Sequence, residues 1–141
     1  MPDTTTRARG QSAEREAAAF LQARGMEILE LNVHVGGGEL DLIAREPAAS
    51  DDAPTIVFVE VRSRSDPRRG TPLETIGRRK RAHLIRAATA WLIERGLWER
   101  VAVRFDVVGI LLDESHARRR VQWVPNAFAA DGDRREVSSR R

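Results

Sequence analysis

The sequence predicts an α/β domain in which a central mixed β-sheet is flanked by helices. The chain has 141 residues, the usual size of one domain, and 41% of them are apolar, which is enough for a core. Segments with helical hydrophobic spacing alternate with runs of β-branched residues. Their order, α-β-β-β-α-β-β, places a helix between the third and fourth strands. That helix allows those two strands to run parallel.

The first helix is predicted at residues 12–24. Ser12 suits its N-cap, and Gly25 suits its C-terminal end. At 100° per residue Glu14 lies beside the inward stripe of this helix. The polar residues 1–10 before it are predicted to be a flexible tail.

The remaining elements follow from periodicity and from turn residues. Strands are predicted at residues 26–34 and 39–45, with Gly36, Gly37 and Gly38 forming a hairpin or tight crossing between them. The later elements are a strand at 55–63, a helix at 73–95, a strand at 101–112 and a short strand at 120–124. The domain is thus expected over residues 11–128, and the polar residues 129–141 are expected to be a disordered tail.

Composition excludes several classes of protein. The chain has no cysteine, so it has neither a disulfide framework nor a thiolate metal site. It shows no signal peptide and no apolar run of about 20 residues that could span a membrane. We therefore expect a soluble, cytoplasmic protein that does not act in a membrane.

Three of the predicted strands carry an acid within an apolar run, namely Asp41, Glu60 and Asp106. Residues two apart in a strand share a face, so Glu60 projects on the side of Phe58 and Arg62. A carboxylate placed so deeply must be solvated, paired or bound to a cation. Each acid alone is also compatible with a solvated sheet face. With Glu14 facing inward as well, the set favours a shared site over that alternative.

Such a cluster suits a hard divalent cation, because Mg²⁺ is commonly held by carboxylates, waters and substrate phosphate. Residues 62–86 contain nine basic side chains and two acidic ones, although the net charge of the chain is only +3. That basic segment suits a phosphate backbone, or else is a solvated helix face and loop. Carboxylates, a metal and phosphate together indicate phosphodiester hydrolysis. The candidate nucleic-acid contacts are Arg64, Arg68, Arg69, Arg78, Arg79, Lys80 and Arg81.

Several ordered motifs resemble the YraN-like family of uncharacterised bacterial proteins. They are AEREAAAFL (13–21), GGGELDLIA (36–44), VFVEVRSR (57–64), TPLETIGRRKRAHLIRAATAWL (71–92), RFDVV (104–108) and NAF (126–128). That family is similar to PD-(D/E)xK nucleases, and particularly to archaeal Holliday-junction resolvases. The resemblance implies a restriction-endonuclease-like fold and a Mg²⁺- or Mn²⁺-dependent endonuclease that acts on DNA, with branched or damaged DNA as the candidate substrate. It also suggests a homodimer.

The resemblance further implies roles for individual residues. Asp41 and Glu60 would hold the metal with the Val61 carbonyl, and Glu14 would assist through water or metal. Position 62 is Arg where the nuclease pattern has Lys. Arg cannot act as a base, but its planar fork can clamp a phosphate or orient a water. The departure at Arg62 keeps open a non-catalytic nucleic-acid-binding module on a degenerate nuclease fold.

Other residues leave alternatives open. Lys80 is the only lysine, and the apolar stripe of the second helix, extended backwards, passes near it. It either contacts phosphate, supplies the ammonium missing at position 62, or lies on a solvated helix start. Asp106 either supports the active site or forms a structural ion pair. Trp91 is predicted to be core, whereas Trp98 and Trp123 either cover sheet edges or stack on bases. A scaffold that binds an acidic protein is a third function.

Overall fold

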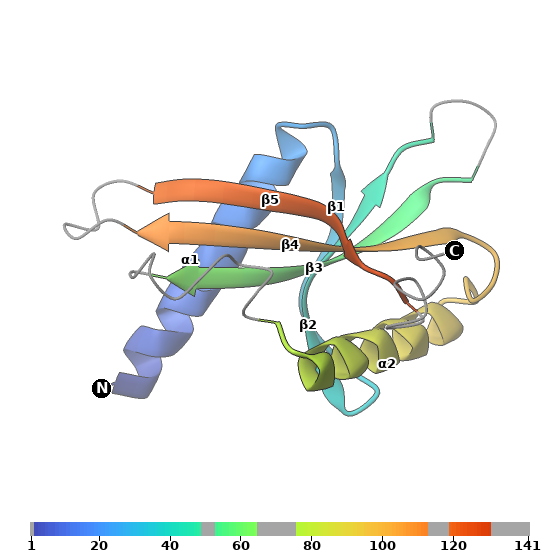
Figure 1. Ribbon diagram of the computed structural model, residues 1–141, viewed down its shortest axis with the longest axis horizontal. Helices are drawn as coiled ribbons and strands as arrows, with labels where there is room; N and C mark the ends of the chain where they lie inside the picture. Colours follow the sequence, from blue (N-terminus) through green and yellow to red (C-terminus); the bar gives the residue numbers. More distant parts are fainter. Residues whose placement is uncertain (1, 49–52, 65–75, 113–118, 131–141) are drawn as a thin grey trace, which may run out of the picture.

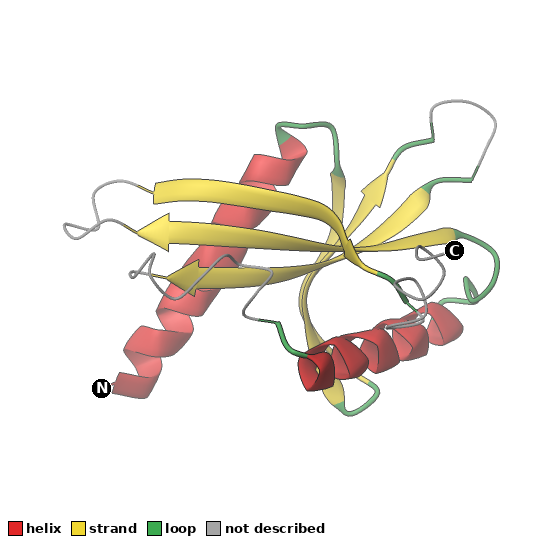
Figure 2. Cartoon of the chain, in the orientation of Figure 1, coloured by secondary structure: helices red, strands yellow, loops and turns green. Residues whose placement is uncertain are grey.

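A computed structural model describes residues 2–48, 53–64, 76–112 and 119–130 of the chain (Figure 1). Its elements are α1 (Pro2–Gln22), β1 (Glu27–Val35), β2 (Gly38–Glu46), β3 (Thr55–Arg64), α2 (Arg78–Glu94), β4 (Ala102–Leu112) and β5 (Arg119–Phe128). The five strands form one sheet in the order β1-β2-β3-β4-β5 (Figure 2). β3 and β4 are parallel, while the other neighbours are antiparallel. The predicted mixed sheet of a single α/β domain is confirmed.

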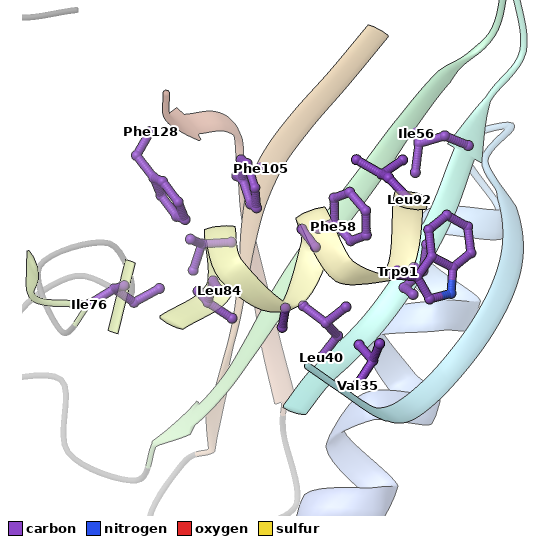
Figure 3. Close-up of a cluster of buried hydrophobic side chains, with 14 residues drawn as sticks. Val35, Leu40, Ile56, Phe58, Ile76, Leu84, Trp91, Leu92, Phe105 and Phe128 are labelled. Carbon is purple, nitrogen blue, oxygen red and sulfur yellow. The ribbon is translucent and has the colours of Figure 1, made fainter. Parts of the chain in front are cut away.

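The two helices cover opposite faces of the sheet, because successive strand residues point to opposite sides. Ile56 and Phe58 of β3 belong to the core cluster under α2, which is drawn in Figure 3. Val57 and Val59 belong to a second cluster, under α1. The predicted division of the faces of β3 is therefore confirmed, and its two faces have different helical partners.

The glycines between β1 and β2 form the predicted hairpin turn, and they also bring the hairpin onto α2. Gly36 and Gly37 have φ of 59° and 75°, a region that favours glycine. A Cβ on Gly36 would lie 2.8 Å from the Cβ of Ala90, and one on Gly38 would lie 3.4 Å from that of Ala87. The absence of side chains thus lets α2 pack directly on the turn.

Both helices begin at residues other than those predicted. α1 begins at Pro2 instead of Ser12, so the helix takes in residues 2–10, which composition had assigned to a tail. A proline at the first helical position costs no hydrogen bond and suits a helix start. α2 begins at Arg78 and its N-cap is Gly77, so Ile76 is not helical. The predicted start at Leu73 lies outside the described residues.

The last strand is longer than predicted. β5 continues through Pro125 to Phe128, although a proline usually weakens a strand prediction. Because β5 is an edge strand, the missing N–H of Pro125 need not break the ladder. The register between β4 and β5 also shifts between Phe105 and Val107. The extension completes the core, since the Phe128 ring stacks on that of Phe105 at 4.9 Å between centroids.

Candidate functional site

The site begins where β2 and β3 separate. Their ladder ends with Leu42 opposite Val59, and if it continued Leu40 would face Val61. Instead, Val61 N–H donates to Oδ2 of Asp41 at 2.9 Å. The Asp41 carboxylate therefore satisfies a backbone donor that has lost its strand partner, and this contact fixes its orientation at the opening of the sheet.

A bend in the hairpin produces this separation. Leu40 and Ile43 both pack in the cluster under α2, three positions apart, so β2 does not alternate strictly between its faces. On β1 the residue between the partners of Leu40 and Leu42 is Asn32, whose φ of 57° is left-handed. Figure 1 shows β2 curving strongly across the sheet. The alternation of faces along β2 is therefore interrupted between Leu40 and Ile43.

Three carboxylates meet at this opening. Oxygens of Glu14 from α1 and of Glu39 and Asp41 from β2 all lie within 4.8 Å of one another. Glu14 thus reaches Asp41, as the sequence predicted. Glu39 was not predicted as a member of the cluster, although its position two residues before Asp41 was a usable signal. All the candidate ligand atoms in this cluster are carboxylate oxygens, which suit Mg²⁺ or Mn²⁺ better than a soft metal.

Glu60 lies beside this group and is only 6% exposed. Its Oε2 is buried and makes no hydrogen bond to any described residue. Burial first, and then the hydrogen bond and charge of Asp41, raise the pKa of Glu60 to about 8, although the charges of Lys80 and Arg62 lower it. Burial, followed by the charges of Asp41 and Glu39, likewise raises the pKa of Glu14 to about 7. Negative charge at this site is therefore undercompensated by the described residues.

Two cationic side chains flank Glu60 from different elements. Arg62 follows it on β3, is half-buried, and has an Nε without a hydrogen-bond partner among the described residues. Lys80 on α2 places its Nζ 3.5 Å from Oε2 of Glu60. That distance is an ion pair without a hydrogen bond, in agreement with the unsatisfied Oε2. The structure thus brings Lys80 to the carboxylate site itself.

Asp106 belongs to a different arrangement, a structural ion pair. Its two oxygens accept hydrogen bonds from Nε and Nη2 of Arg104 at 2.9 and 3.1 Å. Trp123 Nε1 donates to it at 2.9 Å and the Asn126 amide at 2.8 Å. Burial lowers the pKa of Arg104, but its bonds and attraction to Asp106, and then to Glu46, raise it overall. Of the two predicted alternatives, the structural one is correct.

The predicted phosphate contacts separate into groups. Arg78 and Arg79 are exposed on the first turn of α2, and Arg64 is half-buried at the end of β3. Arg81 instead has a structural role, because its Nε donates to the Ile76 carbonyl at 3.1 Å and its guanidinium lies over the Phe128 ring. The remaining two, Arg68 and Arg69, lie outside the described residues.

The tryptophans also differ from one another. Trp91 is core as predicted, and its indole donates to Glu30 at 3.1 Å. Trp98 is 46% exposed after α2. Trp123 lies edge-on to Phe20 of α1 as well as binding Asp106, so it joins β5 to the helix.

In the part of the chain that is described, no helix is long and apolar enough to cross a membrane.

The fold and site define a class of protein: a single α/β domain that gathers carboxylates at a split in a mixed sheet. Comparison with known proteins then gives the family. Residues 13–110 match the model of uncharacterised protein family UPF0102. The chain belongs to this family, which confirms the resemblance to YraN-like proteins.

Individual relatives agree with this assignment. The chain is 43% identical over 122 residues to a UPF0102 protein of Marinobacter nauticus, covering 86% of this chain and 93% of the relative. It is 44% identical over 119 residues to a UPF0102 protein of Pseudomonas putida, covering 84% and 90%. A UPF0102 protein of Anaeromyxobacter is 43% identical over 126 residues, covering 89% and 88%. These names describe a family without stating an activity.

Proposed function

We propose that this protein is a Mg²⁺- or Mn²⁺-dependent endonuclease that hydrolyses DNA on a restriction-endonuclease-like fold. The observation that supports this most directly is Glu60, a buried carboxylate with an unsatisfied oxygen beside a cluster of further acids. Strongly perturbed carboxylates in one cluster are typical of functional sites. The order of elements and the acids on α1, β2 and β3 also match the pattern implied by the family resemblance.

The residues fit a divalent cation. Asp41 and Glu60 supply carboxylate oxygens, and their mutual repulsion would be relieved by bound positive charge. In an extended strand the N–H and C=O of one residue point toward the same neighbour. Because the Val61 N–H points to Asp41, its carbonyl also faces the gap left by β2. Asp41, Glu60 and the Val61 carbonyl would therefore hold the metal.

In the proposed hydrolysis a water adds to the phosphorus, and the bond from phosphorus to the leaving oxygen breaks. A cation bound here would lower the pKa of a coordinated water and stabilise charge on the phosphoryl oxygens. Glu14 would accept a hydrogen bond from the attacking water and so orient it. Arg62 would hold a non-bridging phosphate oxygen with its fork, since it stays protonated.

The DNA backbone would lie along the start of α2. Arg78 and Arg79 are exposed there, and the first turn contains no acidic residue. Backbone N–H groups at a helix start point toward a bound anion and add to the attraction for phosphate. We therefore expect DNA affinity that falls steeply with salt.

Arg62 favours a second candidate function, a non-catalytic nucleic-acid-binding module. An arginine at this position does not supply the proton chemistry of a lysine. Such a module would bind nucleic acid in a salt-dependent manner with or without metal.

The deciding experiment measures cleavage of labelled duplex, single-stranded, flap and four-way-junction DNA with Mg²⁺ or Mn²⁺. Glu60→Gln and Asp41→Asn should each reduce the rate by about 100-fold or more, because each removes charge at the reacting centre. Glu94→Gln is the matched control, since Glu94 is exposed on α2. It should cleave like the wild type. DNA binding without cleavage of any substrate would instead establish the binding module.

A further inference from the structure

Lys80 occupies an unusual place on α2. The buried residues of this helix include Leu84, Ala87, Ala88 and Trp91, and Lys80 lies one turn before Leu84 on the same stripe. Its side chain is 41% exposed, and Nζ ends 3.5 Å from a buried oxygen of Glu60. The ammonium thus lies at the rim of the carboxylate site, with one side toward Glu60 and another toward solvent.

This placement does not improve the helix. Four basic residues in succession, Arg78 to Arg81, begin α2, and its N-cap Gly77 provides no side-chain hydrogen bond. Positive charge at a helix N-terminus opposes the macrodipole. The positive charges in the first turn of α2 therefore lower the stability of the helix start. Such a loss of stability is common where residues are retained for function.

Lys80 also fails to neutralise Glu60 as a structural partner would. Arg104 binds both oxygens of Asp106 with directed hydrogen bonds, whereas Lys80 makes only an ion pair with Glu60. Lysine is the compact, three-donor cation, while Arg62 on the same site offers a planar fork. The two cations beside Glu60 are thus suited to different partners: a small one such as water, and a phosphate.

We propose that Lys80, from α2, is the catalytic cation that orients the attacking water, the role that a lysine on β3 would otherwise have. This inference rests on the proposed nuclease function. The ammonium stays protonated and donates a hydrogen bond to the water oxygen, which adds to phosphorus as the bond to the leaving oxygen breaks. The water's surplus proton passes to solvent, and the leaving oxygen takes up a proton from solvent.

The test compares single-turnover cleavage at saturating protein in Mn²⁺. Lys80→Met should lower the maximum rate by about 100-fold, the scale for loss of one transition-state contact. The double variant Arg62→Lys, Lys80→Met returns an ammonium to the neighbourhood of Glu60 from β3. It should recover at least about tenfold over Lys80→Met. Arg100→Met removes one positive charge from an exposed turn and should behave like the wild type.

A second readout does not depend on cleavage. Mn²⁺ affinity, measured by electron paramagnetic resonance without DNA, should be equal or tighter in Lys80→Met, because a competing cation has left Glu60. Weaker Mn²⁺ binding, or a lower melting temperature that accounts for the lost rate, would make Lys80 a structural residue and overturn the inference.

The outcomes separate the two proposals. A wild type that cleaves none of the DNAs contradicts the nuclease function, and with it the role of Lys80. A wild type that cleaves, with Lys80→Met equally fast, contradicts the role of Lys80 alone. A double variant as slow as Lys80→Met, where Arg62→Lys alone cleaves like the wild type, would also overturn the inference, because an ammonium beside Glu60 would then not be what the reaction needs.

Discussion

Two buried carboxylates in neighbouring strands differ in how fully their oxygens are hydrogen-bonded. Glu60 on β3 is 6% exposed and Asp106 on β4 is 1% exposed, and Val59 next to Glu60 pairs with Asp106 across the ladder. Every oxygen of Asp106 has a hydrogen-bond donor, from Arg104, Trp123 or a backbone amide. An oxygen of Glu60 has none among the described residues.

This difference is the reason for assigning Asp106 a structural role and for proposing a functional role for Glu60. A buried charge that is fully hydrogen-bonded strengthens one arrangement of the chain, whereas an undercompensated one is a cost that a folded protein rarely keeps without use. Burial alone therefore does not identify a functional acid. The state of its hydrogen bonds is a second criterion, and it can be tested by changing each carboxylate separately.

The largest effect is expected at Asp106. Asp106→Ala should lower the free energy of unfolding by about 3–5 kcal/mol, because it leaves Arg104 half-buried without its main partner. Urea denaturation measures this change. Glu46→Gln removes the other, more exposed partner of Arg104 and should cost less than about 1 kcal/mol. A loss for Asp106→Ala as small as that of the control would remove the contrast between the two acids.

Substitution of Glu60 is expected to raise the free energy of unfolding, whereas substitution of Asp106 lowers it. Its pKa is raised from 4.5 to about 8, so the folded protein holds the proton more tightly than the unfolded chain. The stability that Glu60 contributes is therefore full below pH 4.5 and lost as pH rises through 8. Glu60→Gln removes this loss, and in chelator at pH 8 it should stabilise the protein by about 2 kcal/mol.

The same measurement across pH provides the check. The gain from Glu60→Gln should fade as the pH falls toward 4.5, where both states of the wild type carry the proton. Denaturation in urea at several pH values gives this curve. A variant less stable than the wild type at pH 8 would show that Glu60 is a structural acid after all.

The smallest effect is expected at Trp123. Trp123→Phe keeps a ring against Phe20 but removes the indole donor to Asp106, and should cost about 1.5 kcal/mol. A double-mutant cycle with Asp106→Ala isolates the bond, since Trp123→Phe should cost much less once the carboxylate is absent. Equal costs in both backgrounds would assign the effect to packing.

Local patterns predicted the individual elements and acids well. The alternation of Ile56 to Val59 predicted the two faces of β3, and the helix between β3 and β4 predicted their parallel pairing. Glu14 and Asp41 could be grouped because helix periodicity places Glu14 beside the inward stripe and Asp41 is an acid within an apolar strand. These features depend on residues close together in the chain.

Other features depend on long-range geometry. Two of the donors to Asp106 come from Trp123 and Asn126, 17 and 20 residues away, on a strand that continues through a proline. The bend in β2 between Leu40 and Ile43 also breaks the strict alternation that the sequence pattern predicts. No local pattern reports such contacts, so the sequence alone could not tell the satisfied acid from the unsatisfied one.

The ion pair between Lys80 and Glu60 has a consequence for how related proteins are recognised. Positions 62 and 80 are far apart in the chain, yet β3 and α2 deliver both side chains to the same carboxylate. Selection on such a site acts on the position of a positive charge in space. The cationic side chain can therefore be encoded in the segment for β3 or in the segment for α2. If Lys80 has the proposed role, a lysine can disappear from a short linear signature and arise elsewhere in the chain while the proposed chemistry is kept. A search that requires the linear motif Glu-x-Lys would miss proteins of this kind. A search for a cationic side chain close to the glutamate in the folded structure would find them.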